Sequence, residues 1–329
     1  MTTYLIRRII QTIPTLLGVT LITFLLIFYS PGDPIDMFYF DPNISAEDKD
    51  RMRSQLCLDR PGWEQYLYYM VGDRSGECPN QGIIFGDFGE SIANDRPVLE
   101  LYREKMWPTL QLTLGAMVIG TVVGIALGII SAIFRATLTD NIIRFMSVLF
   151  DAIPSFFLGI MLIIVFGVNL GWFPLGGMVP IRSSETVNIW VRLHHLVLPT
   201  IVLGVGWIAV MSRYMRAETL EVLGQDYVRT AKSKGLSGFK VYFKHAARNA
   251  LIPIVTIIGP AITALLGGSV VIERIFSWPG MGRMVLEALA QRDFPVVMAV
   301  TIISAVLVIA GNLLADILLV MVDPRVRLS

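Results

Sequence analysis

Long apolar stretches alternate with polar segments along the chain. An α-helix needs about 20 mostly apolar residues to span the core of a bilayer. Six stretches follow this pattern, of which the fourth is the shortest: 9–30, 108–134, 145–172, 196–212, 251–272 and 296–322. Helices satisfy every backbone polar group inside lipid, whereas the strands of a barrel would alternate with period two. The pattern therefore predicts an all-α integral membrane protein with six transmembrane helices.

The first apolar stretch follows Arg7 and Arg8, as the core of a secretory signal peptide would. Its apolar run of about 22 residues is longer than the 7–15 residues of a signal. The sequence after it, Ser-Pro-Gly-Asp-Pro at 30–34, has no small-residue cleavage pattern. We therefore expect residues 1–30 to be a retained membrane anchor.

The distribution of charge predicts the orientation of the chain. Only 16% of the residues are charged and 54% are hydrophobic, whereas soluble domains carry roughly 25% charged residues. Segment 213–248 has eight Lys or Arg and three acids, while segment 31–106 has eight basic and fifteen acidic residues. Basic loops stay on the cytoplasmic side. Six crossings therefore place 213–248 and both termini in the cytoplasm and 31–106 outside.

The external segment 31–106 predicts a small cap, followed by the core membrane domain at 107–329. Ser45 and Asp48 form a capping-box-like start for a helix that runs to residue 56. Pro61-Gly62-Trp63 opens a second helix through Met70. Residues 72–89 are rich in glycine and polar residues and predict loops, and 97–106 predicts an amphipathic helix that leads into the second span.

Cys57 and Cys78, the two cysteines of the chain, both lie in the external segment. An oxidising compartment permits a disulfide there, and closing a loop of about 20 residues would contribute roughly 3 kcal/mol. The alternative is a pair of free thiols. No histidine lies in this segment, so a zinc site is not expected, and no cluster of His, Cys or carboxylates in the spans indicates another metal site.

The polar segment 213–250 predicts a helix, a break and a second helix. Residues 218–230 can continue the fourth span as a helix, Gly235 breaks it, and 239–248 can form a helix that returns to the membrane. Such a knob can plug into a groove on a partner protein and move as a rigid body. The alternative is a basic loop that sets orientation and binds anionic lipid.

Three acids near the ends of spans are candidates for a pathway or a gate: Asp151, Glu273 and Asp316. Acids at these depths are costly and usually face the bundle interior or a cavity. For Asp151 and Asp316 we favour a structural role, in which each ties helices together through backbone donors or an arginine. Glu273 is expected just outside the fifth span, either in an outer vestibule or in a salt bridge with Arg274 or Arg283.

Residues 226–235, Asp-Tyr-Val-Arg-Thr-Ala-Lys-Ser-Lys-Gly, followed by Leu-Ile-Pro at 251–253, resemble the coupling loop of binding-protein-dependent ABC importers. Other motifs resemble the dipeptide and oligopeptide permease subunits of that class and occur in the same order. They lie at 4–8, 11–18, 30–34, 58–61 (Leu-Asp-Arg-Pro), 86–91 (Gly-Asp-Phe-Gly-Glu-Ser), 96–98, 272–276 (Ile-Glu-Arg-Ile-Phe), 279–282 (Pro-Gly-Met-Gly), 292–295 (Arg-Asp-Phe-Pro), 312–316 and 323–327.

The resemblance implies a type I ABC importer permease that forms half of a translocation path for di- or oligopeptides by alternating access. Relatives of this kind also carry nickel chelates, glutathione or oligosaccharides. The implied partners are a second homologous permease subunit, two cytoplasmic ATP-binding subunits and an extracytoplasmic solute-binding protein, in a bacterial or archaeal inner membrane. The implied coupling residues are Asp226, Arg229, Thr230, Ala231, Lys234 and Gly235. Arg229-Thr230-Ala231 replaces the Glu-Ala-Ala of the wider class, which makes Asp226 the candidate acid.

The sequence does not favour an enzyme. It has no Gly-x-x-x-x-Gly-Lys-Ser/Thr loop, so ATP and Mg²⁺ are expected on partner ATPases and no cofactor on this chain. An intramembrane hydrolase needs a nucleophile beside a base, but His194, His195 and His245 lie outside the mid-membrane. An ion-coupled secondary transporter would carry a polar site near the midplane, where this chain is nearly free of charge.

Overall fold

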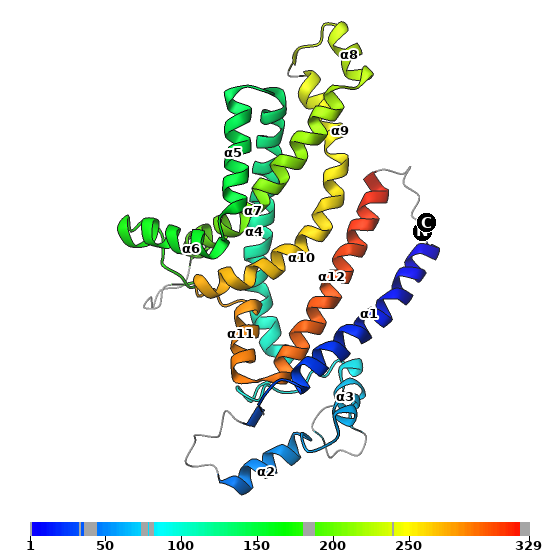
Figure 1. The fold of residues 1–329 in the computed structure, drawn as a ribbon, viewed down its shortest axis with the longest axis vertical. Helices are drawn as coiled ribbons and strands as arrows, with labels where there is room; N and C mark the ends of the chain where they lie inside the picture. Colours follow the sequence, from blue (N-terminus) through cyan, green and yellow to red (C-terminus); the bar gives the residue numbers. More distant parts are fainter. Residues whose placement is uncertain are drawn as a thin grey trace. The chain divides into compact units, whose positions relative to one another are not determined.

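Helices dominate the described part of the molecule. A computed structural model describes residues 2–32, 34–35, 45–73, 78, 82–179, 188–238 and 240–322. Among these residues there is no strand, only an isolated bridge between Glu90 and Pro97. The elements are α1 (Thr2–Phe28), α2 (Ala46–Gln55), α3 (Gly62–Val71), the 3-10 helix η2 (Ile83–Phe85), α4 (Val98–Ile133), α5 (Leu138–Ala152), α6 (Ser155–Leu162), the π-helix η3 (Ile163–Asn169), α7 (Ile189–Leu223), α8 (Asp226–Ser233), the π-helix η4 (Lys240–Ala247), α9 (Arg248–Ala250), α10 (Ile252–Ile275), α11 (Met281–Gln291) and α12 (Phe294–Val322) (Figure 1). The predicted all-α class is confirmed.

Several of these helices are long and apolar enough to cross a membrane. Within the described residues, four segments qualify: Ile10–Phe28, Val98–Ile133, Ile189–Leu223 and Phe294–Leu313. A fifth span results if the bent pair Leu138–Ala152 and Ser155–Asn169 is counted as one. The helix α10 covers the fifth predicted stretch, but several side chains in its middle lie outside the described residues. The chain is a multi-pass membrane protein, and the exact number of six crossings stays a prediction.

The third predicted stretch, 145–172, does not form a continuous straight helix. The helix α5 ends at Ala152, Ile153 adopts an extended conformation with ψ 123°, and the axis turns by 100° between α5 and the following helices (Figure 1). Pro154 explains the break, because proline lacks a backbone N–H and disfavours the helical conformation of the residue before it. The continuous apolar stretch 145–172 therefore contains a sharp bend that its composition does not indicate.

The fourth predicted stretch, 196–212, is part of a much longer helix. The helix α7 has 35 residues and extends beyond the apolar stretch at both ends, with Pro199 inside it. It stops at Leu223, so the prediction of one continuous helix over 218–230 is wrong. Gly224 is a poor helix former, and Gln225 is extended with ψ 149° and starts the separate helix α8.

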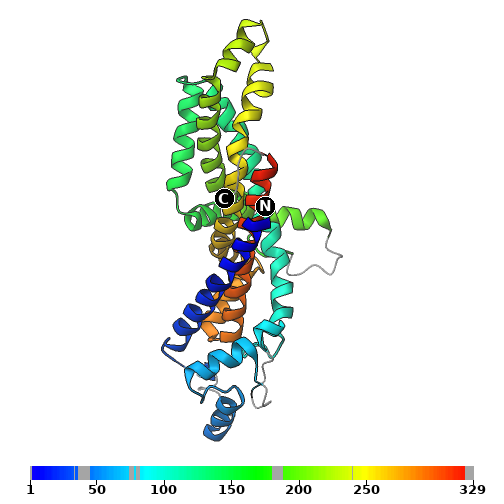
Figure 2. The ribbon, with the colours of Figure 1, turned by 90° about the vertical axis from the view of Figure 1, so that its right-hand side faces the viewer.

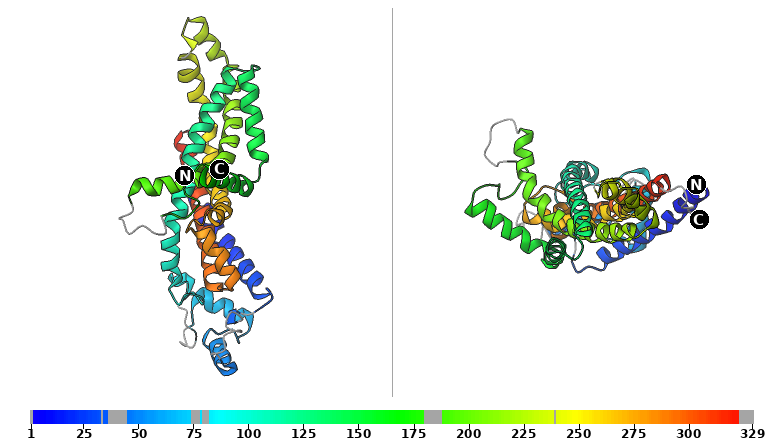
Figure 3. Two further views of the ribbon diagram at one scale, coloured as in Figure 1. Left: turned by 90° about the vertical axis from the view of Figure 1, so that its left-hand side faces the viewer. Right: turned by 90° about the horizontal axis from the view of Figure 1, so that it is seen from above.

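By its contacts the chain divides into two units, residues 1–107 with 283–309 and residues 108–282 with 310–329. The core of the second unit includes a close seam between α4 and α7, which run side by side with α5 (Figure 3). Gly120, Gly124 and Gly128 on α4 face Trp207, Met211 and Met215 on α7 at a spacing of four residues. A Cβ at Gly124 would lie 2.4 Å from the Met211 Cβ, so small residues allow these helices to approach closely.

The first unit contains the cap. The helix α2 begins with the predicted capping box, in which the Asp48 N–H donates to the Ser45 hydroxyl over 3.1 Å. Hydrogen bonds from the Ser45 hydroxyl and N–H hold the pKa of the Asp48 carboxyl below its usual range. The predicted second helix is α3. A disulfide joins Cys57 to Cys78, with 5.9 Å between the Cα atoms, and encloses α3.

Two of the motifs quoted above meet in the first unit. Asp293, which is buried, accepts hydrogen bonds from the Ser91 hydroxyl and from the backbone N–H groups of Ile92 at 3.2 Å and Ala93 at 3.4 Å. The Gly-Asp-Phe-Gly-Glu-Ser and Arg-Asp-Phe-Pro motifs, about 200 residues apart in the sequence, are therefore held together by one carboxylate.

Candidate functional site

The polar segment after α7 folds into a compact hairpin, which we call the 224–250 hairpin. It comprises α8, η4 and α9 and lies at the end of the second unit where α7 stops (Figure 2). Asp226 in the first turn of α8 and Lys232 in its last turn both complement the helix dipole. Gly235 has φ +75° and ends the helix, in the left-handed region that favours glycine. The break predicted at Gly235 is confirmed.

A small apolar core holds the hairpin together. Val228 and Ala231 on one face of α8 are buried and pack against Val241 of η4. Val222 and Leu223, at the end of α7, close this core from below. The helix α8 is therefore held against the last turn of α7 by apolar packing.

The opposite face of α8 is polar and open. Five of the six predicted coupling residues are exposed. Four of these carry a charged or hydroxyl side chain, namely Asp226, Arg229, Thr230 and Lys234, and the fifth is Gly235. The ion pair of Arg229 and Asp226 spans 3.5 Å with side chains 74% and 96% exposed, so it contributes little stability. Ala231, the sixth predicted residue, is buried inside the hairpin.

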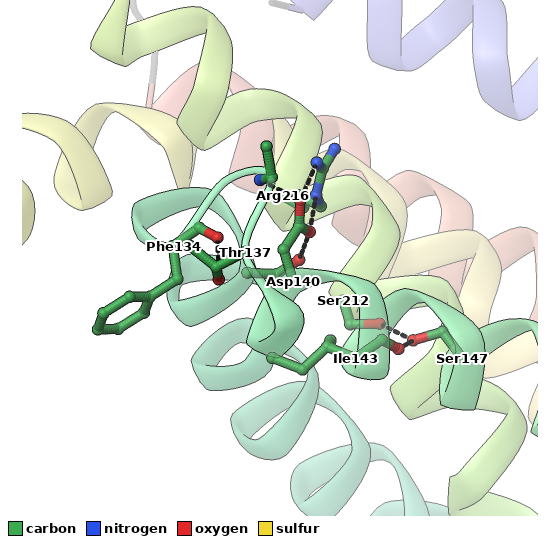
Figure 4. Close-up of polar contacts among 9 residues, drawn as sticks. Phe134, Thr137, Asp140, Ile143, Ser147, Ser212 and Arg216 are labelled. Atoms are coloured by element: carbon green, nitrogen blue, oxygen red, sulfur yellow. Dashed lines mark hydrogen bonds and ion pairs between the residues drawn. The ribbon is translucent and has the colours of Figure 1, made fainter.

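Buried polar contacts fix α7 to the turn between α4 and α5 (Figure 4). Arg216 of α7 donates to both carboxylate oxygens of Asp140, from Nε and Nη2, each over 2.8 Å. The Asp140 carboxylate, whose side chain is 1% exposed, also accepts from the Ser131 hydroxyl at 2.6 Å and the Ala136 N–H at 3.0 Å. This bidentate, fully satisfied pair fixes the position of α7 two turns before the hairpin.

Two more contacts join α5 to α7. The hydroxyls of Ser147 and Ser212 lie 2.9 Å apart (Figure 4). Asp151, one of the predicted gate candidates, forms an ion pair of 2.9 Å with Arg213. This arginine partner fits the structural role that we favoured for Asp151. Together with the Asp140 pair, these contacts join α5 to α7 at three positions.

Glu273, the second gate candidate, lies in the last turn of α10 and is completely buried. It accepts a hydrogen bond of 2.6 Å from the Thr109 hydroxyl, which in turn accepts one of 2.8 Å from the Met281 N–H. A Cβ at Gly280 would lie 2.3 Å from the Glu273 carboxyl carbon. The carboxylate is enclosed by the turn after α10 and by α4, which does not fit the vestibule alternative, and the alternative of a salt bridge with Arg274 or Arg283 stays a prediction.

Asp316, the third gate candidate, is on α12, but its side chain lies outside the described residues. Asp140 and Arg216 were missed by the sequence analysis. The available signal was an acid, the third residue of the helix after the second span, and a basic residue four positions after the end of the fourth span. Nothing in one sequence links two residues 76 positions apart, so the pair became visible only in the fold.

Two family models together cover nearly the whole chain. Residues 1–113 match the N-terminal part of the membrane component of binding-protein-dependent transport systems, and residues 124–328 match the inner membrane component of these systems. The chain belongs to this permease family. The resemblance drawn from the 226–235 segment is thereby confirmed.

Full-length relatives agree with this assignment of the permease. This permease is 43% identical to the oligopeptide transport system permease protein AppB of Bacillus subtilis strain 168. The match extends over 328 residues and covers 99% of this chain and 100% of the relative. It is 36% identical to the dipeptide permease protein DppB of Escherichia coli K12, over 98% of both chains. It is 37% identical to the glutathione permease protein GsiC of the same strain, over 99% of both chains.

The fold of the permease also matches a solved transporter. A chain of the inward-facing MetNI methionine ABC transporter superimposes with a TM-score of 0.54 and 18% identity, covering 68% of this chain and 97% of that chain. The predicted type I importer architecture is confirmed at the level of the fold.

Proposed function

We propose that this permease imports di- or oligopeptides as half of an ATP-driven transporter. The observation that carries the proposal is the 43% identity over 99% of the chain to an oligopeptide permease. The dipeptide relative and the glutathione relative support the same substrate class, since glutathione is itself a small peptide. We assign the other half of the path to a second, homologous permease subunit.

The exposed face of α8 is our candidate docking surface for a cytoplasmic ATPase. Arg229, Lys232 and Lys234 give this face a positive charge, and Asp226 supplies the one acid. Both termini and the hairpin lie in the cytoplasm in this proposal, following the excess of basic residues in segment 213–248. ATP hydrolysis belongs to two partner ATPases, and an extracytoplasmic solute-binding protein delivers the peptide.

In the proposed cycle, nucleotide binding draws the 224–250 hairpin inward together with α7. Because Arg216, Arg213 and Ser212 join α7 to α5, the two helices tilt as one element. The paired permeases then open outward to receive substrate, and hydrolysis returns them. Our proposal gives Ala231 the role of holding α8 on the hairpin core, and gives the contact with the ATPase to the exposed residues.

The experiment that tests this function combines co-purification with a charge reversal. The tagged chain is purified in mild detergent, and the expected companions are a second permease and ATPases.

In the reconstituted transporter, the double variant Arg229→Glu and Lys234→Glu should lower ATP-dependent peptide uptake several-fold, because the charge that faces the ATPase is inverted.

Arg135→Glu, an exposed arginine on the turn after α4, is the matched control and should leave uptake unchanged. Equal uptake by the double variant and the wild type would remove α8 from the coupling mechanism. Solute uptake by the purified chain alone, driven by an ion gradient without ATP, would replace the proposal with a secondary transporter.

A further inference from the structure

One face of α3, the second helix of the cap, is apolar and uncovered. Trp63, Leu67 and Val71 repeat at every fourth position and are 65%, 48% and 39% exposed. Residues at this spacing lie on the same side of a helix. The adjoining helix η2 packs on α3 and exposes Ile84 and Phe85 by 65% and 70%. Isolated exposed apolar residues are normal, but a contiguous set marks an interaction surface.

The helix α3 contacts α1 within the apolar span of that helix. Its first residue, Gly62, packs on the ring of Phe28, because a Cβ at Gly62 would lie 2.9 Å from the Phe28 Cζ. One turn later, the Tyr66 ring lies 5.4 Å from the Phe24 ring, and the Tyr66 hydroxyl lies 2.8 Å from the Thr20 hydroxyl. The Tyr66 side chain therefore reaches further into the α1 span than Gly62 does.

These contacts give a depth. The apolar span of α1 ends at Phe28, and Thr20 is eight residues inside it, or roughly 12 Å along the helix axis. A cap held in water above the membrane would touch α1 only at its end. Contacts with Phe24 and Thr20 therefore place the Tyr66 side chain of α3 below the end of the span.

The surroundings at this depth identify the partner. Leu21, Ile22, Leu25 and Leu26 of α1 are 43%, 60%, 40% and 70% exposed, as expected of a lipid-facing helix. The uncovered face of α3 is apolar as well. The helix itself contains four aromatic residues in ten, Trp63, Tyr66, Tyr68 and Tyr69, and one charge, Glu64. Tryptophan and tyrosine concentrate where hydrocarbon meets headgroups.

We propose that α3 is an interfacial helix that inserts its Trp63–Leu67–Val71 face into the outer leaflet of the bilayer. Such helices lie about 5–10 Å below the headgroup boundary. The inserted helix anchors the cap to the membrane at a second point besides α1. The inference depends on the membrane location of the chain and not on which solute it transports.

The test places a nitroxide spin label at residue 67 in the permease reconstituted in phosphatidylethanolamine–phosphatidylglycerol vesicles. Leu67→Cys is labelled beside two references: Leu25→Cys on the exposed side of α1 and Ser54→Cys, an exposed position on α2. The disulfide leaves Cys57 and Cys78 without a free thiol, and the wild type treated with the label supplies the background. Collision rates with oxygen, which concentrates in lipid, and with a water-soluble nickel chelate are then compared.

The ratio of oxygen to nickel collisions at residue 67 should match that at residue 25 and exceed that at residue 54 several-fold. A ratio at residue 67 equal to that at residue 54 would show that α3 is in water and would overturn the proposal. Protection of residue 67 from both reagents, appearing only when a second permease or a binding protein is added, would assign the face to protein docking and would also overturn it.

Discussion

Asp140 shows how a single residue can determine the position of a helix. It has no water to solvate its charge, since its side chain is 1% exposed, but it accepts four hydrogen bonds from Arg216, Ser131 and the Ala136 backbone. Arg216 is itself only 22% exposed. Removing one partner of such a pair leaves a charge without compensation.

Asp140→Asn should therefore destabilise the protein by about 3–5 kcal/mol, the typical cost of breaking a buried ion pair from one side. The measurement is thermal unfolding of the detergent-solubilised protein. Asp226→Asn is the matched control, because the Asp226 side chain is 96% exposed and its ion pair is screened by water. Equal unfolding temperatures for the two variants would mean that the Asp140 pair is not what holds α7.

At this scale, exposed functional residues could be predicted from the sequence more easily than the partners of buried ones. The charged residues of α8 and the break at Gly235 both belong to one contiguous motif, and the structure adds the positive φ of Gly235. For Glu273, which borders an apolar run, the sequence leaves a vestibule and a salt bridge with Arg274 or Arg283 as alternatives. Its burial depends on Thr109, 164 residues away, and on the close approach of Gly280, which only the fold reveals.

Among the elements, α4 and α7 form the closest-packed pair that the glycines define. Gly120, Gly124 and Gly128 admit the side chains of Trp207, Met211 and Met215 at distances where a Cβ would collide. The hydrophobic effect does not drive helices together in lipid, so van der Waals contacts of this kind stabilise the helix pair instead. The seam is thus sensitive to the addition of a single carbon atom.

Gly124→Ala should destabilise the protein by about 1–3 kcal/mol, the usual cost of overpacking, because the new Cβ meets the Met211 Cβ at 2.4 Å. The control is Gly206→Ala on α7, where no heavy atom lies within 4 Å of the added Cβ. That substitution should be neutral or stabilise by about 0.5–1 kcal/mol, because alanine favours a helix. If the Gly124→Ala variant unfolds at the same temperature as the control, close packing of α4 on α7 at Gly124 does not contribute to stability.

Helix positions could largely be predicted from apolar length, since α1, α4, α7, α10 and α12 each cover a predicted stretch. The capping box and the turn at Pro61 also located α2 and α3, because local chemistry determines both. The 100° bend after α5 could not be predicted, because Pro154 allows a break without setting its angle. The angle depends on packing. One such contact is that of Gly159 on α6 with Phe276, where a Cβ added to Gly159 would lie 3.3 Å from Cε2 of the Phe276 ring.

For the whole molecule, the decisive feature is the difference in charge between two polar segments of the chain. Segment 213–248 and segment 31–106 differ in sign, and the 224–250 hairpin and the cap belong to different units of the fold. The proposed function requires these two segments on opposite sides of the membrane. The orientation is a prediction that two exposed serines allow to be tested.

Ser233→Cys on α8 and Ser54→Cys on α2 should react with a membrane-impermeant maleimide from opposite sides. In inverted vesicles, Ser233→Cys should be labelled and Ser54→Cys protected, and in right-side-out vesicles the reverse should hold. Each variant is the control of the other, because both place a thiol on an exposed helical position. Labelling of both from the same side would refute the six-crossing topology.

The disulfide has a consequence for how the protein is made. Cys57 and Cys78 bracket α3, and the cytoplasm, where synthesis takes place, keeps thiols reduced. If the segment lies outside the cytoplasm, as the charge distribution predicts, the bond forms only after the insertion machinery has carried this loop across the membrane. A nascent chain inserted upside down would keep both thiols, so the covalent bond records correct biogenesis, and the fraction of oxidised chains counts the molecules that were inserted correctly.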